Sequence, residues 1–123
     1  MYTLDTNAII YYMKGDSETV DFLNGVFAED VIFYISTITE LELFGFSDIT
    51  KSDAKHIERI LETVTIIPVD SRIARLAGAI RSRFRVGAAD SAIAATALAT
   101  GSTLITRNVK DFKNIPNLNI LRI

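Results

Sequence analysis

Short apolar runs alternate with amphipathic stretches along the chain. The runs rich in β-branched and aromatic residues predict strands, and they lie at 2–4, 31–36, 64–69, 102–106 and 118–123. Hydrophobic side chains at helical spacing predict helices between them, at 8–13, from 17 onward, at 37–46, 52–63, 72–84 and 88–100, and a single turn at 108–112. Strands that alternate with helices indicate the α/β class, here a three-layer α/β/α sandwich with a central, mainly parallel sheet.

The helix at 37–46 is the one whose phase matters most for function. Thr37 and Glu40 have the form of a capping box, with a hydroxyl at the cap and a carboxylate three residues later. This phase puts the inward stripe on Ile38, Leu41 and Gly45. Glu42 then lies at the i+4 position of the stripe, so it is the candidate functional acid and Glu40 is a structural one. If the helix is phased one residue wrong, Glu42 is instead a surface acid.

Composition narrows the chemistry that the chain can perform. Its 123 residues, 49% of them hydrophobic, suit a single domain over 1–123 with a substantial core. The absence of cysteine excludes a disulfide framework, a thiolate zinc site and a cysteine nucleophile. No apolar run approaches a membrane span and no leader precedes the first strand, so we expect a soluble, cytoplasmic protein with no membrane partner. The net charge of −2 argues against binding nucleic acid by bulk positive charge.

Three acids are placed to meet at one edge of the predicted sheet. Asp5 directly follows the first strand, Glu42 lies on its helix, and Asp90 opens the alanine-rich helix 88–100. Carboxylates gathered there repel one another unless a hard cation neutralises them, and oxygen donors suit Mg²⁺ or Mn²⁺. Such a site performs metal-assisted phosphoryl chemistry. For Asp5 and Asp90 the structural alternative is a helix N-cap.

The residues around the last helical turn, and the basic residues before Asp90, each allow two interpretations. Asn108 can cap the turn with Asp111 as its third residue, and this structural interpretation is favoured for both. Arg107 can meet a phosphate or be solvated. Arg83 and Arg85 belong to the only basic concentration of the chain, where a solvated helix face is favoured over a rim that guides a nucleic-acid strand.

Several other kinds of active site lack the residues that they need. The single histidine, His56, excludes metal-free RNA cleavage by a histidine acid–base pair. No glycine-rich phosphate loop is present, and no segment resembles the nucleophile elbow of serine hydrolases. These exclusions favour the metal-assisted interpretation of the acids.

Four segments together resemble the PIN domain, and specifically the VapC-type toxins of type II toxin–antitoxin systems. The matching pieces are LDTNAII at the start of the chain, STITELEL from Ser36, DSAIAATAL from Asp90 and LITRNVKDF from Leu104. They follow one another at family-like spacing over essentially the whole chain. Each motif is weak alone, and the four in order are fairly specific.

The resemblance implies a Mg²⁺- or Mn²⁺-dependent ribonuclease with an α/β/α fold that forms a homodimer and is inhibited by an antitoxin covering its cleft. Asp5, Glu42 and Asp90 match the family's metal-binding acids, and Thr39 matches a threonine whose hydroxyl supports them. Many PIN domains have a fourth acid at the position of Asn108. Either Asn108 positions a metal-bound water here, or Asp111 supplies the charge through water. We therefore expect one tightly held ion and a weaker second site.

Two other functions stay open. An aspartyl-nucleophile phosphohydrolase would use Asp5, although enzymes of the haloacid dehalogenase type have a second aspartate where this chain has Asn7. A catalytically weak PIN-like module that binds RNA or a protein would explain the missing fourth acid. Aromatic residues on short helices can form a groove for an antitoxin or a dimer face, with core packing slightly favoured for each: Tyr11, Tyr12, Phe22, Phe44 and Phe46.

Overall fold

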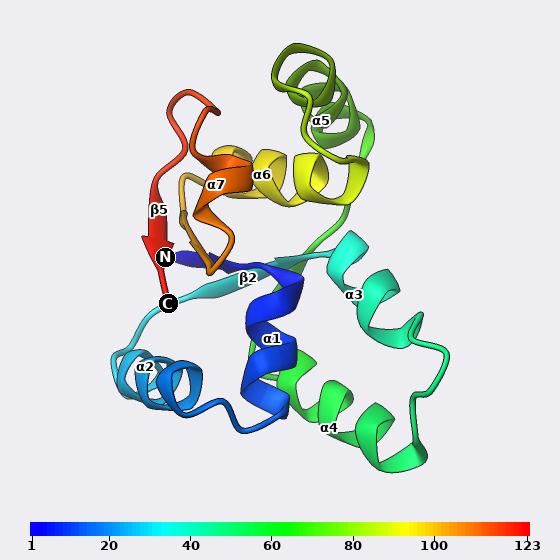
Figure 1. The fold of residues 1–123 in the computed structure, drawn as a ribbon, viewed down its shortest axis with the longest axis vertical. Coiled ribbons are helices and arrows are strands. Elements are labelled where there is room, and N and C mark those ends of the chain that lie inside the picture. Colours follow the sequence, from blue (N-terminus) through cyan, green and yellow to red (C-terminus); the bar gives the residue numbers. More distant parts are fainter.

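The elements of the computed structural model, which describes residues 1–123, follow the predicted order (Figure 1). The strands are β1 (Tyr2–Leu4), β2 (Phe33–Ser36), β3 (Thr65–Ile67), β4 (Thr103–Thr106) and β5 (Ile120–Arg122). The helices are α1 (Thr6–Met13), α2 (Ser17–Phe27), α3 (Thr37–Phe44), α4 (Lys51–Leu61), α5 (Ser71–Phe84), α6 (Ala88–Thr100) and α7 (Val109–Phe112). Several strands are shorter than predicted, because only residues that pair with a neighbouring strand take part in the sheet.

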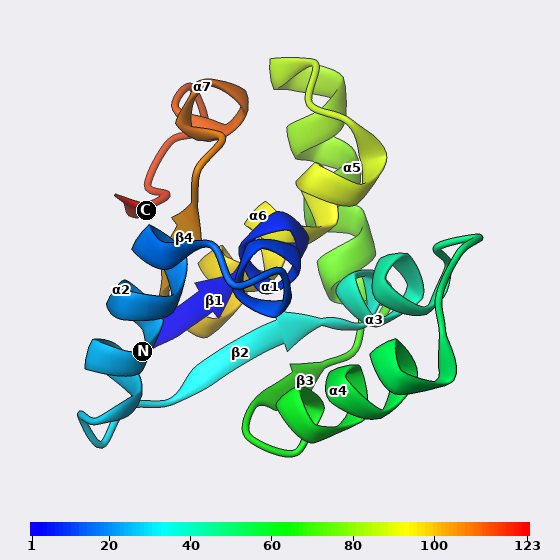
Figure 2. The same cartoon turned by 60° about the horizontal axis from the view of Figure 1, so that its bottom comes forward.

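All five strands run parallel, in the order β3-β2-β1-β4-β5 (Figure 2). The central strand β1 pairs with β2, where Tyr2 lies opposite Phe33, and with β4, where Leu4 lies opposite Ile105. The strand order reverses between β1 and β4. In open α/β sheets, such a reversal leaves a crevice at the carboxyl ends of the two strands, where ligands bind.

Helices cover both faces of the sheet, so the predicted three-layer α/β/α sandwich is confirmed (Figure 1). One hydrophobic core joins the sheet to α1, α2, α3 and α4, and a second joins it to α5, α6 and α7. Consecutive residues of β4 enter different cores, Leu104 the second and Ile105 the first, because side chains alternate along a strand.

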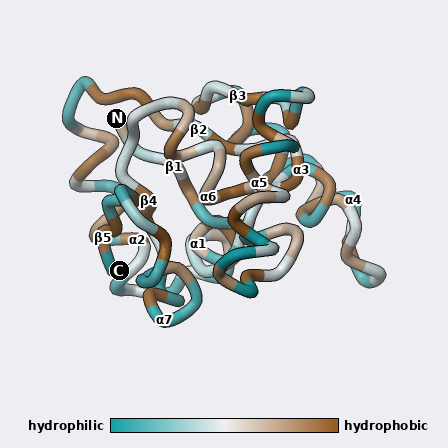
Figure 3. The backbone as a smooth tube through the Cα atoms, turned by 90° about the horizontal axis from the view of Figure 1, so that it is seen from above, coloured by the Kyte–Doolittle hydropathy of each residue, from teal (hydrophilic) through white to brown (hydrophobic).

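Helix α6 is the most deeply placed helix, as its apolar sequence predicts. Its side chains from Ser91 to Ala97 are all buried, and the small alanines let it lie close to both the sheet and α5. Gly101 ends it in the left-handed conformation, with φ at 64°. Figure 3 shows hydrophobic stretches in the interior of the molecule and strongly hydrophilic stretches at its periphery.

The predicted capping box at the start of α3 is wrong. The N-cap is Ser36, whose hydroxyl accepts a hydrogen bond from the amide of Ile38 at 3.1 Å. The hydroxyl of Thr37 instead accepts from the amide of Val69 at 3.1 Å, in the segment after β3. Glu40 is therefore not a capping-box acid.

The predicted inward stripe of α3 is correspondingly wrong at two positions. Leu41 is 66% exposed, and the fully buried side chains are those of Thr39 and Leu43. The helix ends at Phe44, and Gly45 is an exposed C-cap. Glu42 nevertheless lies on the side of α3 that faces α1.

None of the helices is long and apolar enough to cross a membrane.

Candidate functional site

Asp5 lies at the end of β1 with its side chain 2% exposed. It occupies the N-cap position of α1, but its side chain makes no capping hydrogen bond. The alternative that this carboxylate serves only as a helix cap is therefore wrong. The hydroxyl of Thr106, at the end of β4, donates to Oδ2 of Asp5 at 2.8 Å. Burial raises the pKa of the Asp5 carboxyl, the Thr106 hydrogen bond opposes this rise, and the charge of Glu42 adds to it.

Thr106 is held in one orientation by the chain that follows it. It is fully buried, and its oxygen accepts a hydrogen bond from the amide of Asn108 at 3.0 Å. The hydroxyl proton is therefore free to point at Asp5. One carboxylate oxygen of Asp5 accepts this bond, and the backbone amides of Thr6 and Asn7 also lower the pKa of the carboxyl, so the chain holds the carboxylate in a fixed orientation.

Glu42 is held in a similar way. The hydroxyl of Thr6, the first residue of α1, lies 2.7 Å from Oε1 of Glu42 and 3.1 Å from the hydroxyl of Thr39. Thr6 has one hydroxyl proton, which it shares between Oε1 of Glu42, the shorter contact, and the hydroxyl of Thr39, which accepts it. Thr39 therefore contacts Glu42 only through Thr6, and the two buried threonines fix the position of a half-buried carboxylate.

Asp90 is the third residue of α6, and Gly87 rather than Asp90 occupies the N-cap. Its pKa is raised to about 6, first by burial and then by the charges of Asp5, Asp111 and Glu42. No hydrogen bond offsets these effects. The four acids therefore act on one another at the carboxyl edge of the sheet, although they come from β1, α3, α6 and α7.

Asn108 and Asp111 lie on the β4 side of this group. Asn108 occupies the N-cap of α7 but forms no side-chain capping bond; its carbonyl accepts from the amide of Asp111 at 3.0 Å. The favoured capping interpretation is thus wrong for the side chain of Asn108. Asp111 is exposed, and its charge acts on Asp90.

The arginines predicted to contact phosphate have different surroundings. Arg107 donates to Oδ2 of Asp16 at 2.7 Å and to Thr19 at 3.0 Å, and its guanidinium lies 4.3 Å from the ring centroid of Tyr11. These contacts engage Arg107 with α1 and α2, so it is neither free for phosphate nor simply solvated. Arg83 and Arg85 are exposed and form no ion pair, and of the two only Arg85 lines a cavity beside the acids.

That cavity has a volume of about 300 Å³. It is lined by the turn between α5 and α6, with Arg85, by Asp90 of α6, and by the α7 segment, with Lys110 and Asp111. Sequence reasoning overlooked Lys110, as it overlooked Thr6 and Thr106. Their positions in the sequence could have indicated the two threonines, because Thr6 directly follows Asp5 and Thr106 is the last residue of the strand β4 beside it.

The donor chemistry of the site suits a hard cation, but the carboxylates do not form a closed cage. No group of three or more His, Cys, Asp or Glu side chains is close enough to hold one ion. Mg²⁺ commonly keeps several of its waters and is bound by one or two carboxylates together with substrate phosphate. The carboxylates of Asp5 and Glu42, each held by a threonine hydroxyl, together with Asp90, which has no positive partner, fit a partly hydrated Mg²⁺ or Mn²⁺ ion.

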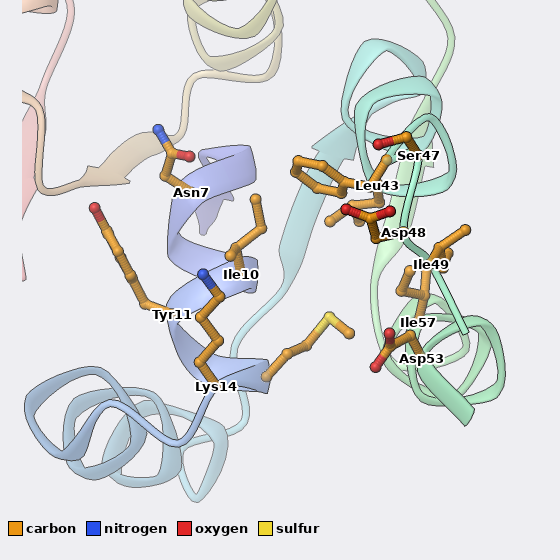
Figure 4. A pocket seen from close by; sticks show the side chains of 12 residues that line it. Asn7, Ile10, Tyr11, Lys14, Leu43, Ser47, Asp48, Ile49, Asp53 and Ile57 are labelled. Carbon is orange, nitrogen blue, oxygen red and sulfur yellow. The ribbon is translucent and has the colours of Figure 1, made fainter. Parts of the chain in front are cut away.

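A larger cavity, of about 570 Å³, lies between α1 and the segment from α3 to α4 (Figure 4). Residues of α1, including Asn7 and Ile10, form one wall, and the other is formed by α3, the segment after it and α4. Its lining is mainly hydrophobic, with charged residues at Lys14, Asp48 and Asp53. Asn7, which lines this cavity, follows Asp5 by two residues in the sequence.

Comparison with known proteins agrees with this architecture. The PIN domain family model matches residues 2–118. The chain is 32% identical to ribonuclease VapC1 of Haemophilus influenzae strain R2866, over 96% of the chain and 94% of that protein. It is 29% identical to ribonuclease VapC2 of Rickettsia felis, over 96% and 94%.

Solved structures of the same kind superpose closely. VapBC2 from Rickettsia felis bound to a promoter DNA fragment matches with a TM-score of 0.84 and 29% identity, over 99% of this chain and 98% of that one. VapBC-1 from nontypeable Haemophilus influenzae matches with a TM-score of 0.80 and 30% identity, over 98% and 96%. The acids that converge at the strand reversal thus lie in a chain that belongs to the PIN domain family and, within it, to the VapC type.

Proposed function

We propose that this protein is a ribonuclease toxin of a toxin–antitoxin pair, which hydrolyses RNA phosphodiester bonds with Mg²⁺ or Mn²⁺ bound among Asp5, Glu42 and Asp90, directly by one or two of these carboxylates and through water by the rest. The observation that carries the proposal is that the acids come together at the strand reversal, where Thr106 holds the buried Asp5 and Thr6 holds Glu42, and where the charges of both act on Asp90. The similarity to ribonucleases named VapC supports RNA as the substrate.

The chain's own residues prepare this site before any ion binds. Thr106 and Thr6 each occupy one oxygen of a carboxylate, on Asp5 and Glu42, and so orient the remaining oxygens. When bound, the ion supplies activation of water and neutralisation of charge on the phosphate oxygens. Asn108 and Asp111 stay candidates for water-mediated support, because both lie beside the acids without a side-chain bond that commits them elsewhere.

The direct test is cleavage of a labelled single-stranded RNA by purified protein. We expect wild type to cut with Mg²⁺ or Mn²⁺ and to stop with EDTA, and Asp5→Asn to lose at least about 100-fold in rate while staying folded, since removal of one ligand weakens both binding and alignment of the ion. Lys51→Gln, an exposed change on α4, serves as the matched control and should cut normally.

Three outcomes would contradict this proposal. Undiminished cleavage by Asp5→Asn would show that Asp5 does not bind a catalytic metal ion. Folded wild type that neither cuts RNA nor binds Mn²⁺ in calorimetry would favour the non-catalytic binding module, which the lack of a three-carboxylate group supports. A phospho-aspartate trapped on Asp5 would instead favour the phosphohydrolase.

We also propose that a segment of the cognate antitoxin occupies the larger cavity. Its hydrophobic lining, with Ile10, Leu43 and Phe46, suits an amphipathic segment, and the similar structures include a toxin–antitoxin complex from Klebsiella pneumoniae. Phe46 is 50% exposed at this cavity. We expect Phe46→Glu to weaken antitoxin inhibition at least about 10-fold while leaving cleavage intact, because a carboxylate there must be desolvated on binding.

The control for this prediction is Ile32→Glu, which places the same charge at a side chain that is 49% exposed and does not line the cavity. Inhibition of cleavage should be measured by titrating purified antitoxin. Equal inhibition of Phe46→Glu and Ile32→Glu would show that the antitoxin binds elsewhere.

A further inference from the structure

We propose that the cavity between the α5–α6 turn and α7 is a phosphate subsite, which binds a phosphodiester of the RNA strand next to the one that is cut, through Lys110 and Arg85. This inference rests on the proposed ribonuclease function and adds the substrate contact that the acids cannot make. The acids alone repel a polyanion, so some other part of the chain must hold it.

Charges from three segments gather in this cavity. Arg85 lines it from the turn between α5 and α6, Lys110 from α7, and Asp90 from the first turn of α6. Two cations from separate segments therefore share the cavity with an acid that the proposed function assigns to the metal. A strand laid across the cavity would place phosphates beside the cations while the cut bond reaches the metal.

Neither cation forms an ion pair within the protein. The one ion pair of the molecule joins Arg107 to Asp16. Lys110 and Arg85 are both exposed and form no hydrogen bond through their side chains, although Asp90 and Asp111 line the same cavity. The space between these charges, about 300 Å³, lies at the lower end of the range for small-molecule sites.

The other arginines near the site differ from Arg85 in their surroundings. Arg107 also lies near the sheet edge, but its bond to Asp16 lowers the pKa of that carboxyl to about 2, which reflects a committed pair. Arg83 does not line the cavity. Arg85 ends α5 in the left-handed conformation, with φ at 55°, and this turn brings the chain around the cavity wall to Gly87 and α6.

The ligand chemistry follows from the donors. A guanidinium presents a planar fork that bonds two phosphate oxygens at once, and an ammonium binds phosphate as a point charge. Neither contact selects a base, so the subsite would contribute affinity and register but no sequence preference. A phosphodiester of a single-stranded RNA can contact both Lys110 and Arg85 while the neighbouring phosphodiester of the same strand lies at the metal site.

The test measures the salt dependence of RNA binding. Fluorescence anisotropy of a labelled single-stranded RNA gives the slope of log K against log of the salt concentration, in an Asp5→Asn background that binds without cutting. Each lost phosphate contact reduces the slope for single strands by about 0.7. We expect this reduction for Lys110→Gln and for Arg85→Asn, a residue that tolerates the left-handed backbone.

Two neutralising changes serve as controls. Lys113→Gln removes a charge three residues beyond Lys110 that does not line the cavity, and Arg59→Gln removes one on the distant helix α4. Both should leave the slope unchanged. Thermal unfolding of each variant confirms that differences in binding do not arise from unfolding.

The outcomes distinguish this inference from the proposed function. If wild type cuts RNA with Mg²⁺ but Lys110→Gln and Arg85→Asn have the slope of Lys113→Gln, the subsite is wrong and the ribonuclease stands. If wild type neither cuts nor binds RNA, both are wrong. If the slope falls equally for all four variants, binding is a general effect of charge and the subsite is again excluded.

Discussion

At the scale of single residues, the site depends on threonines as much as on acids. Thr106 and Thr6 are buried, and each places a hydroxyl within 2.8 Å of a carboxylate oxygen. A buried carboxylate without such a partner would be protonated or would turn toward solvent. The threonines therefore hold Asp5 and Glu42 in place. Asp90 has no such bond, so burial and the repulsion of the other acids raise its pKa without an opposing hydrogen bond.

This difference makes Asp90 the residue whose replacement should stabilise the fold. Its pKa of about 6 lies above the ordinary value of 3.8, so the folded state binds this proton more tightly than the unfolded chain. The carboxylate thus lowers the free energy of unfolding above pH 6, and the loss disappears as the pH falls toward 4. We expect Asp90→Asn to raise the free energy of unfolding by about 1 kcal/mol at neutral pH without metal, after allowance for solvent screening.

Thermal or denaturant unfolding at neutral pH and near pH 4 checks this prediction. The gain from Asp90→Asn should be present at the higher pH and absent at the lower. Added Mn²⁺ should stabilise wild type and not the variant, since an ion that binds only the folded state shifts the equilibrium toward it. A variant that is less stable than wild type at neutral pH would show that the acids do not repel one another there.

At the scale of elements, helix α2 is joined to the sheet edge through its N-cap. Asp16 accepts from the amide of Thr19 at 3.1 Å, from the hydroxyl of Thr19 at 2.7 Å and from Arg107 at 2.7 Å. The Arg107 hydrogen bond and the Thr19 bonds hold its pKa at about 2, well below 3.8. A carboxylate with a lowered pKa contributes stability above its unfolded value, and the contribution is lost as the pH falls through about 2.

We expect Asp16→Ala to lower the melting temperature at neutral pH more than Asp16→Asn does. Asparagine keeps an acceptor for the helix amide but loses the ion pair, whereas alanine loses both. The deficit of Asp16→Asn should shrink as the pH falls from about 4 to 2, where wild type loses the same charge. Asp21→Asn, an exposed change on the same helix, is the control. Equal melting temperatures for Asp16→Ala and Asp21→Asn would show that the Asp16 side chain does not stabilise α2 as its N-cap.

The order of the elements could be predicted from the chain because it depends on local patterns, and the phase of α3 could not. Ser36 and Thr37 are both good caps, and the choice between them depends on Val69, 32 residues away, whose amide bonds to Thr37. Glu42 was correctly placed toward the site although Leu41 was wrongly placed inward. Local pattern identifies the acids: Asp5 follows a strand end, Glu42 lies at helical spacing, and Asp90 opens an apolar helix. It does not identify Lys110, because the rest of its cavity belongs to a distant segment of the chain.

At the scale of the whole molecule, helix α3 has a different environment on each side. Glu42 and Thr39 face the site, while Leu41 is 66% exposed and Phe44 is 41% exposed. Two large apolar side chains at i and i+3 lie on the same face of a helix. Such a face on the surface is typical of an interface with another chain, and the expected homodimer supplies one.

In a dimer formed through α3, the partner subunit would lie against the same helix that carries Glu42. We therefore expect Leu41→Glu to shift wild-type dimer to monomer in sedimentation equilibrium, weakening association at least about 100-fold, because a charge would be buried at the centre of the contact. Ile32→Glu adds the same charge at a side chain that is 49% exposed before β2, and should leave the association unchanged. Since Leu41 packs against nothing within the monomer core, loss of the dimer should leave the folded spectrum intact. If Leu41→Glu sediments as wild type does, then Leu41 is not part of the interface, and a dimer, where one forms, uses another surface.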